Sequence, residues 1–283
     1  MKTIYHFSGA GNDFVVIDGR EGDVTAFREV PRIEALCQEY KTDGMMILGS
    51  GNTEVDFTME FYNPDGSGGM MCGNGGRCIV AFADYLGIKP ASGGVFLFMA
   101  PDGLHTGEIL ERPEEGLWTV RIKMIDVQGI TPMKGGFFLN TGTRHFVKFV
   151  DDVEQVDVDA EGKTLRWDPA FAPIGTNVNF VHVAPDGLHV RTFEKGVEGE
   201  TLACGTGLTA SAIAAYEISR LRPAGSARND NDPVISTKAE GRVEKSYRLR
   251  ARQDWLSVNF TPGADEKFTD VYLTGPARLV EIH

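Results

Sequence analysis

Hydrophobic and polar positions alternate in short runs along most of the chain. Residues 3–18 have the pattern of a strand, a Gly-rich turn and a second strand, and residues 55–62 alternate as a further strand. Residues 31–40 carry apolar positions at helical spacing, and from residue 95 onward the pattern predicts mostly short strands. The sequence therefore predicts a mixed α/β fold in which strands predominate.

Two longer segments depart from this alternation. One begins at Cys72, is apolar all round over Ile79–Ala83, and is expected to end near Leu86 because Gly87 is a plausible C-cap. The other is apolar over much of Leu208–Ile218. A helix without a polar face is usually buried on all sides. We therefore expect two central helices, each surrounded by strands.

The two apolar helices follow matched cysteine segments, MCGNGG around Cys72 and ACGTG around Cys204. The separation is 204 − 72 = 132 residues, and the same shift relates two further pairs of positions: Phe14 with Phe146 and Phe61 with Phe193. This register indicates two fused copies of one α/β unit. We predict a first domain of residues 1–116 plus 266–283, a second domain of residues 117–265, and an active site in the cleft between them.

Composition narrows the class of protein. The net charge of −12 argues against nucleic-acid binding, which needs a basic surface. The N-terminus lacks a signal-peptide pattern and no run of about 18 apolar residues occurs, so we expect no membrane association and a cytoplasmic location. In that reducing setting the four cysteines are expected to be free thiols. Residues 223–233, rich in Pro, Gly and Asn, are expected to form an exposed loop.

A thiol at the start of a helix meets unpaired N–H groups and a partial positive charge, which favour its thiolate. Two such thiols on opposite sides of a substrate can invert a carbon next to a carboxylate, because one removes a proton and the other returns one. The helix-start N–H groups can hold the carboxylate and the developing enolate charge. Neither a zinc motif nor a phosphate-binding loop occurs in the sequence, and we expect no metal or cofactor.

The sequence resembles the diaminopimelate epimerase family over nearly its whole length. Five segments carry the resemblance in order: SGAGNDFVVID, FYNPDGSGGMMCGNGGRC, GTNVNFV, FEKGVEGETLACGTG and VYLTGPARLVEI. The resemblance implies two pseudo-symmetric domains, each a curled, mostly antiparallel sheet around a central helix. It also implies cofactor-independent interconversion of LL- and meso-diaminopimelate, with a diamino dicarboxylic acid as the small-molecule partner and a homodimer as one candidate assembly.

The resemblance further implies roles for individual residues. Cys72 and Cys204 would be the acid–base pair, and His145 and Glu194 would tune the pKa values of their thiols. The implied substrate-binding residues are Asn12, Asn63, Gly73, Asn74, Asn177, Glu194, Lys195, Gly205 and Thr206.

Two departures from the family pattern affect the site. Thr143–Arg144 stands where the family usually has Asn-Pro before the histidine, and Lys195 stands where it usually has Arg. A lysine cannot reproduce the two-pronged contact of arginine with a carboxylate. One hypothesis is that Arg144 supplies that guanidinium, since 144 − 132 = 12 makes it the counterpart of Asn12.

Three alternatives stay open on the sequence alone. A proline or hydroxyproline racemase would use the same two-cysteine logic on a similar fold. A thiol-redox protein would join Cys72 and Cys204 in a disulfide. A binding protein of the same fold would hold the ligand without turnover.

Overall fold

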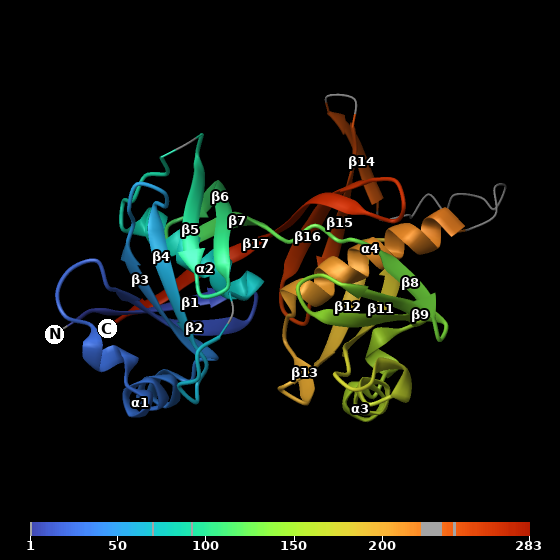
Figure 1. Cartoon of the computed structure of the whole chain (residues 1–283), viewed down its shortest axis with the longest axis horizontal. Coiled ribbons are helices and arrows are strands. Elements are labelled where there is room, and N and C mark those ends of the chain that lie inside the picture. The colour runs from blue at the N-terminus through green and yellow to red at the C-terminus, as the bar shows by residue number, and fades with distance from the viewer. Residues whose placement is uncertain (1, 70, 92, 222–233, 240–241) are drawn as a thin grey trace. The chain divides into compact units, whose positions relative to one another are not determined.

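The computed structural model of the chain divides into two compact units (Figure 1). It describes residues 2–69, 71–91, 93–221, 234–239 and 242–283, so the expected loop at 223–233 lies outside the described residues. Unit 1 comprises residues 1–123 and 274–283, and unit 2 comprises residues 124–273. The domain boundaries expected from the sequence fall in turns, after β6 (Gly103–Glu114) and before β17 (Phe268–Ile282), and they stay a prediction.

Unit 1 is built from strands whose pairings form a closed ring. The ring follows the chain from β1 to β7, and the C-terminal part of β17 pairs antiparallel with both β7 and β1. Two pairs in the ring, β2–β3 and β4–β5, are parallel, and the others are antiparallel. The strands are β1 (Ile4–Gly9), β2 (Asn12–Asp18), β3 (Gly44–Ser50), β4 (Phe57–Tyr62), β5 (Val95–Ala100), β6 (Gly103–Glu114), β7 (Leu117–Lys123) and β17 (Phe268–Ile282).

The helix α2 (Gly73–Tyr85) is the central helix of unit 1. Every residue of α2 from Gly73 to Ala83 is buried, and the helix packs against β1, β2, β3, β6 and β7. It ends at Tyr85, with Leu86 as its C-cap, and the next residue, Gly87, has a φ of 77°, in the left-handed region that glycine adopts most easily. The expectation of a buried helix surrounded by strands is confirmed here.

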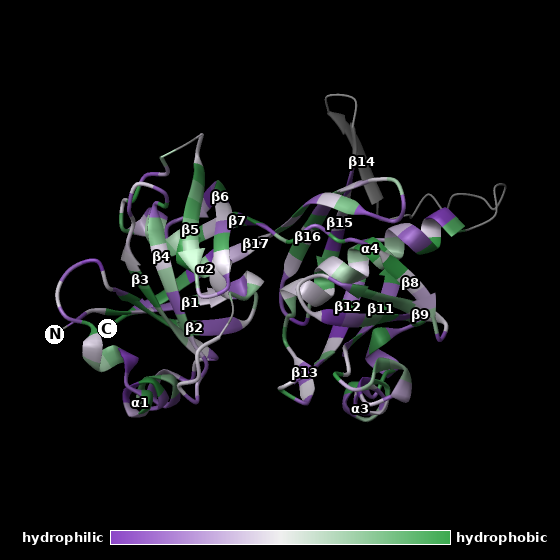
Figure 2. Ribbon diagram, in the orientation of Figure 1, coloured by the Kyte–Doolittle hydropathy of each residue, from purple (hydrophilic) through white to green (hydrophobic). Residues whose placement is uncertain are grey.

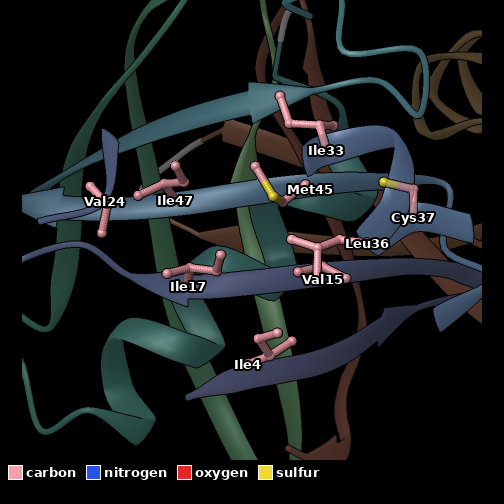
Figure 3. Packing of buried hydrophobic residues seen from close by; sticks show 9 residues of the cluster. All are labelled: Ile4, Val15, Ile17, Val24, Ile33, Leu36, Cys37, Met45 and Ile47. Carbon is pink, nitrogen blue, oxygen red and sulfur yellow. The ribbon is translucent and has the colours of Figure 1, made fainter. Parts of the chain in front are cut away.

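A second layer covers the outer face of β1–β3 in unit 1. It consists of η1 (Thr25–Arg28) and α1 (Val30–Tyr40), with Pro31 in the first turn of α1. Ile33, Leu36 and Cys37 lie on one face of α1 and pack against apolar strand residues such as Val15 and Ile47 (Figure 3). Cys37 is therefore a core residue.

Unit 2 repeats this plan. Its strand pairs β9–β10, β10–β11, β11–β12, β12–β15 and β15–β16 are antiparallel, parallel, antiparallel, parallel and antiparallel in that order. The pairs from β1–β2 to β5–β6 in unit 1 follow the same order. The strands are β8 (Ile130–Met133), β9 (Gly136–Asn140), β10 (Arg144–Phe149), β11 (Asn177–Ala184), β12 (Gly187–Glu194), β13 (Gly199–Thr201), β14 (Val234–Ala239), β15 (Arg242–Arg250), β16 (Trp255–Pro262) and the first part of β17. The mixed α/β fold predicted from the sequence is confirmed.

The central helix of unit 2 is α4 (Gly205–Leu221). It packs against β9, β10, β11, β12, β15 and β16, and Figure 2 shows hydrophobic and weakly polar residues along most of it. The outer layer is formed by η2 (Val153–Gln155), α3 (Val158–Arg166) and η3 (Pro169–Phe171). Phe171, Phe146 and Phe193 belong to the apolar cluster on this outer side.

Residues 132 positions apart occupy equivalent places in the hydrogen-bond register of the two units. Their side chains, however, do not lie on equivalent faces of the sheets. Met46 is paired with Phe61 and Val178 with Phe193, at shifts of 178 − 46 = 132 and 193 − 61 = 132. A Cβ on Gly75 of α2 would lie 3.3 Å from Met46 Sδ and 3.4 Å from Phe61 Cε2, so this pair faces the central helix. Val178 and Phe193 face the outer layer.

The pair that faces α4 in unit 2 is instead Asn179 with Thr192. A Cβ on Gly207 of α4 would lie against Asn179, and these two strand residues are paired directly. Residues on equivalent faces are therefore separated by 179 − 46 = 133 positions on one strand and by 192 − 61 = 131 positions on the next. The cysteines and the helix starts keep the shift of 132, since α2 begins at Gly73 and α4 at Gly205.

Candidate active site

Cys72 is the N-cap residue of α2. Its backbone is extended, its carbonyl accepts the first helical hydrogen bond from Gly76 N at 2.8 Å, and its Sγ accepts a hydrogen bond from Gly75 N at 3.2 Å. The residue is exposed. This geometry is what the sequence predicted, a sulfur directed at the free N–H groups of a helix start.

Cys204 lies at the corresponding position of α4. Its carbonyl accepts a hydrogen bond from Leu208 N at 2.9 Å, but the residue is buried, at 5% exposure. Burial raises the pKa of the Cys204 thiol well above its usual value. The nearby Glu194 carboxylate raises it further, while hydrogen bonds from Thr206 and Gly207 N oppose the rise. At Cys204 the loss of solvation outweighs the thiolate-favouring effect expected of the helix start.

Polar groups beside Cys72 are tied together by Arg77, a fully buried arginine inside α2. Its guanidinium donates to Asn74 Oδ1 at 2.9 Å and to the carbonyls of Gly73 and Pro276 at 3.1 and 3.2 Å. Asn74 Nδ2 in turn donates to Asn12 Oδ1. The first two turns of α2 are thereby fastened to β2 and β17. Arg77 was not among the residues expected at the site, although an arginine beside the apolar part of a helix is a usable signal.

Asn63 lies in the loop that leads from β4 to Cys72. Its backbone N donates to Ser67 O at 2.8 Å and its Nδ2 to Ser67 Oγ at 3.0 Å, while its carbonyl accepts from Gly66 N. These bonds are those of a turn-building asparagine. Its expected contact with substrate stays a prediction.

In unit 2, the face of β10, β11 and β12 that covers α4 carries a cluster of buried polar side chains. His145 is fully buried, and its Nε2 lies 2.9 Å from both Thr206 Oγ1 and Thr143 Oγ1. Its Nδ1 lies 3.0 Å from Asn179 Nδ2. Burial lowers the pKa of His145 to about 3, so the ring is neutral at physiological pH.

Thr206 joins this cluster to Cys204. Its Oγ1 lies 3.4 Å from Cys204 Sγ and 3.1 Å from Thr143 Oγ1, and its backbone carbonyl accepts from Thr141 Oγ1 at 2.8 Å. Thr143, one of the two departures from the family pattern, therefore lies beside His145 and Thr206. The sequence marked Thr143 only as a departure from the family pattern, and it did not single out Asn179.

Asn177 holds the segment that contains Lys195. Its Oδ1 accepts from Lys195 N at 2.7 Å, and its Nδ2 donates to Arg144 O at 3.0 Å. Because Glu194 precedes Lys195 at the end of β12, this bond also positions the carboxylate that interacts with Cys204. The sequence placed these three residues in one site, and the structure brings Asn177 and Lys195 into direct contact.

The hypothesis that Arg144 replaces a substrate-binding guanidinium is wrong in this structure. Arg144 Nη1 donates to the carbonyl of Phe171 at 3.3 Å, and the guanidinium lies over the Phe138 ring at 5.1 Å. Phe171 belongs to the apolar cluster on the outer side of unit 2, and Phe138 of β9 packs against that cluster. Neighbouring residues of a strand point to opposite faces, so Arg144 must point away from the face that holds His145.

Within the described ranges, no cluster of three or more His, Cys, Asp or Glu side chains could hold a metal ion. Among the helices that the structure describes, none is both long enough and apolar enough to cross a membrane.

Comparison with known proteins places this geometry in a family. A family model described as diaminopimelate epimerase matches residues 4–94 and 137–247. Curated diaminopimelate epimerases from Chlorobaculum tepidum and Flavobacterium psychrophilum are 36% and 35% identical to this chain, with 96% and 98% of it covered and 97% of each relative. The diaminopimelate epimerase of Aquifex aeolicus is 40% identical over 75% of this chain and 80% of its own.

Solved structures share the fold at low sequence identity. A PhzF-family phenazine biosynthesis protein from Bacillus anthracis has a TM-score of 0.69 at 12% identity, covering 100% of this chain and 98% of its own. A hydroxyproline epimerase from Agrobacterium vitis has a TM-score of 0.59 at 14% identity, covering 100% of this chain and 91% of its own. The solved structures show a shared fold, while the family model and the curated relatives show that the chain belongs to the diaminopimelate epimerase family and is an isomerase.

Proposed function

We propose that this protein interconverts LL- and meso-diaminopimelate at one α-carbon, in the supply of precursors for lysine and peptidoglycan. The observation that carries the proposal is the pair of cysteines, each immediately before the central helix of its own unit. Membership of the diaminopimelate epimerase family supports the choice of substrate. The proposal requires that the two sulfurs approach opposite faces of the same carbon when substrate binds.

The proposed reaction transfers two protons. A thiolate removes the α-proton and becomes a thiol, and the C–H electron pair passes into the substrate carboxylate as an enolate-like anion. The other thiol then donates its proton to the opposite face and becomes a thiolate. The helix-start N–H groups next to each cysteine stabilise the charge that develops on the carboxylate. After one turnover the protonation states of the two cysteines are exchanged, which suits a reversible reaction.

The environment of Cys204 supports its starting as the acid when Cys72 acts as the base. Burial and the Glu194 carboxylate raise the pKa of Cys204, which favours the protonated thiol. Cys72 is exposed, and Gly75 N donates to its sulfur, a bond that stabilises a thiolate. Cys204 is therefore the proposed acid in this direction, and Cys72, with a backbone donor at its sulfur, is the proposed base.

The remaining substrate contacts are proposed from the family positions. Asn74, Gly73, Gly205 and Thr206 would hold the reacting carboxylate at the two helix starts. The residues proposed to bind the other polar groups of the substrate are Asn12, Asn63, Asn177, Glu194 and Lys195. The hydrogen bond from Lys195 N to Asn177 supports a fixed position for the Lys195 backbone. Its ammonium would bind a distal carboxylate as a single charge.

The test is incubation with LL-diaminopimelate in D2O, followed by proton NMR. Wild-type protein should exchange one α-hydrogen for deuterium and form the meso isomer, and Cys72→Ala and Cys204→Ala should each abolish epimerisation. Cys37→Ala is the matched control, because Cys37 is a buried thiol of the α1 core. Full activity of Cys204→Ala would refute the two-base scheme.

A substrate panel separates the alternatives. Turnover of proline or hydroxyproline without turnover of diaminopimelate would assign a racemase of the same fold. Reversible disulfide exchange without α-proton exchange would assign a thiol-redox protein, and ligand binding without exchange would assign a binding protein. A cytoplasmic location and assembly into a homodimer stay predictions from the sequence.

A further inference from the structure

We propose that Asn179 is a positioning residue that holds His145 as its Nε2–H tautomer and thereby directs the Thr206 hydroxyl onto the Cys204 sulfur. The residues involved form one continuous series of hydrogen bonds, which we call the Asn179 chain: Thr192, Asn179, His145, Thr206 and Cys204. The inference rests on the proposed function only in assigning Cys204 to acid–base work.

The first link fixes the orientation of the Asn179 amide. Asn179 Nδ2 lies 3.4 Å from the carbonyl oxygen of Phe146, which can only accept, so the atom facing it must be the nitrogen. The Thr192 hydroxyl donates to Asn179 Oδ1 at 3.0 Å from the other side. A flipped amide would set Oδ1 against the carbonyl oxygen of Phe146 and lose that bond, so the donor end of Asn179 is directed at His145.

The second link fixes the tautomer of His145. Asn179 Nδ2 donates to His145 Nδ1 at 3.0 Å, so Nδ1 must carry a lone pair. Burial keeps the ring neutral, which leaves its single proton on Nε2. Nε2 therefore donates to the hydroxyl oxygens that face it, those of Thr206 and Thr143.

The third link follows from the single proton of a hydroxyl. Thr206 Oγ1 accepts from His145 Nε2, and Thr143 Oγ1 lies 3.1 Å away as a second neighbour. Thr143 Oγ1 accepts from Asn177 Nδ2 at 3.3 Å as well as from His145, so its own proton is directed at Thr206 Oγ1. The proton of the Thr206 hydroxyl is then left for Cys204 Sγ, at 3.4 Å. A hydroxyl that donates to sulfur stabilises the thiolate over the thiol.

Unit 1 provides an internal comparison for this arrangement. On the strand face that covers α2, the positions equivalent to His145, Asn179 and Thr192 are occupied by Phe14, Met46 and Phe61. All three are buried and apolar. The same framework therefore folds with apolar groups under the helix start, and fold stability alone does not require polar residues there.

The Asn179 chain counters the groups that favour the protonated thiol. Glu194 is the charged side chain that acts on Cys204, and it opposes ionisation together with burial. His145 is a titratable member of the Asn179 chain, but its ring is neutral. It therefore acts on Cys204 only through its hydrogen bond to Thr206. A protonated imidazole would hold the thiolate in an ion pair, whereas a neutral donor lets Cys204 both lose and regain a proton.

The direct test is the tautomer of His145, read from its ring-nitrogen shifts by NMR in the full chain without substrate. The chain has 6 histidines, and His145→Gln identifies the signals that belong to His145. Wild-type protein should show the neutral Nε2–H tautomer. In Asn179→Asp a carboxylate faces Nδ1, so Nδ1 should become protonated. A wild-type Nδ1–H tautomer would overturn the proposal, whether or not any variant folds.

The second test is the pH dependence of Cys204 alkylation by iodoacetamide, followed by mass spectrometry of the peptide that contains Cys204. Thr206→Val and Asn179→Asp should raise the apparent pKa of alkylation by about one unit, which corresponds to about 1.4 kcal/mol. Thr206→Ser should restore the wild-type profile. Thr209→Val is the matched control, because the Thr209 hydroxyl donates to Gly205 O within α4 and lies outside the Asn179 chain.

Neither measurement requires epimerase activity, so the proposed function and the Asn179 chain can fail separately. A protein that does not epimerise but shows the expected tautomer and alkylation profiles would refute the function alone. An active enzyme in which Thr206→Val and Thr209→Val alkylate alike would refute the chain alone.

Discussion

The matched glycines Gly75 and Gly207 allow the two helix starts to be compared by one substitution each, Gly75→Ala and Gly207→Ala. Gly75 lies three residues after Cys72, and Gly207 lies three residues after Cys204. In Gly75→Ala the new methyl group would lie 3.3 Å from Cys72 Sγ and from Met46 Sδ, and 3.4 Å from Phe61 Cε2. The Met46 and Phe61 atoms belong to the ends of side chains that can shift by a few tenths of an ångström.

In Gly207→Ala the methyl group would lie only 2.3 Å from Asn179 Oδ1, in addition to 3.3 Å from Cys204 Sγ. Asn179 cannot yield in the same way, because Thr192, Phe146 and His145 hold both ends of its amide. The methyl group must therefore displace Asn179 or the start of α4. Overpacking of this kind typically costs about 1–3 kcal/mol.

Alanine also improves helix propensity over glycine by about 1 kcal/mol, and this gain applies to both variants. The difference in unfolding free energy between the two variants therefore measures the clash of the new methyl group with Asn179 and the loss of the Asn179 hydrogen bonds. We expect the unfolding free energy of Gly207→Ala to be about 2 kcal/mol below that of Gly75→Ala. For a unit of this size that difference lowers Tm by about 4–8 °C.

The assay is thermal denaturation of both variants beside wild type, with Cys204 alkylation measured on the same samples. Gly207→Ala should also shift the alkylation profile of Cys204, because it displaces Asn179. Equal Tm values for the two variants would refute the reasoning, since they would mean that the Asn179 amide is not rigidly held.

Three further predictions follow from buried groups. Arg77→Met removes three hydrogen bonds from a buried guanidinium, to Asn74 Oδ1 and to the carbonyls of Gly73 and Pro276. Urea denaturation should therefore show a loss of about 3 kcal/mol, partly recovered in Arg77→Lys, and an unchanged midpoint would contradict this. Folding lowers the pKa of His145 to about 3, so just below about pH 6.5 the unfolded ring binds a proton while the folded ring stays neutral. The free energy of unfolding should therefore fall as pH falls, by about 2 kcal/mol from about pH 6.5 to 5. This contribution should be absent from His145→Gln. Folding raises the pKa of Cys204, so above about pH 8.5 the thiol ionises in the unfolded state first, and the free energy of unfolding falls as pH rises. Cys204→Ser does not ionise in this range and should lose less stability between about pH 8 and 10. Parallel plots of unfolding free energy against pH for the two proteins would rule this out.

The sequence by itself determined the framework of the site. Matched Cys-Gly segments followed by helices without a polar face predicted two central helices, and the structure places Cys72 and Cys204 immediately before them. This succeeds because helix starts, apolar helices and turn residues are recorded in local sequence. The chemistry of a thiol at a helix start follows from the same few residues.

Only the tertiary structure decided which strand residues meet those thiols. The 132-residue shift matched Phe61 with Phe193, yet Phe61 faces α2 while Phe193 faces the outer layer. Side chains alternate between faces, so a shift of one residue exchanges the whole set that a helix contacts. For the same reason Arg144 lies outside the site and His145 inside it, and the sequence could not distinguish Asn179 from a strand asparagine without a role. Contacts between residues far apart in the chain depend on how the strands pair, and the local sequence does not record that pairing.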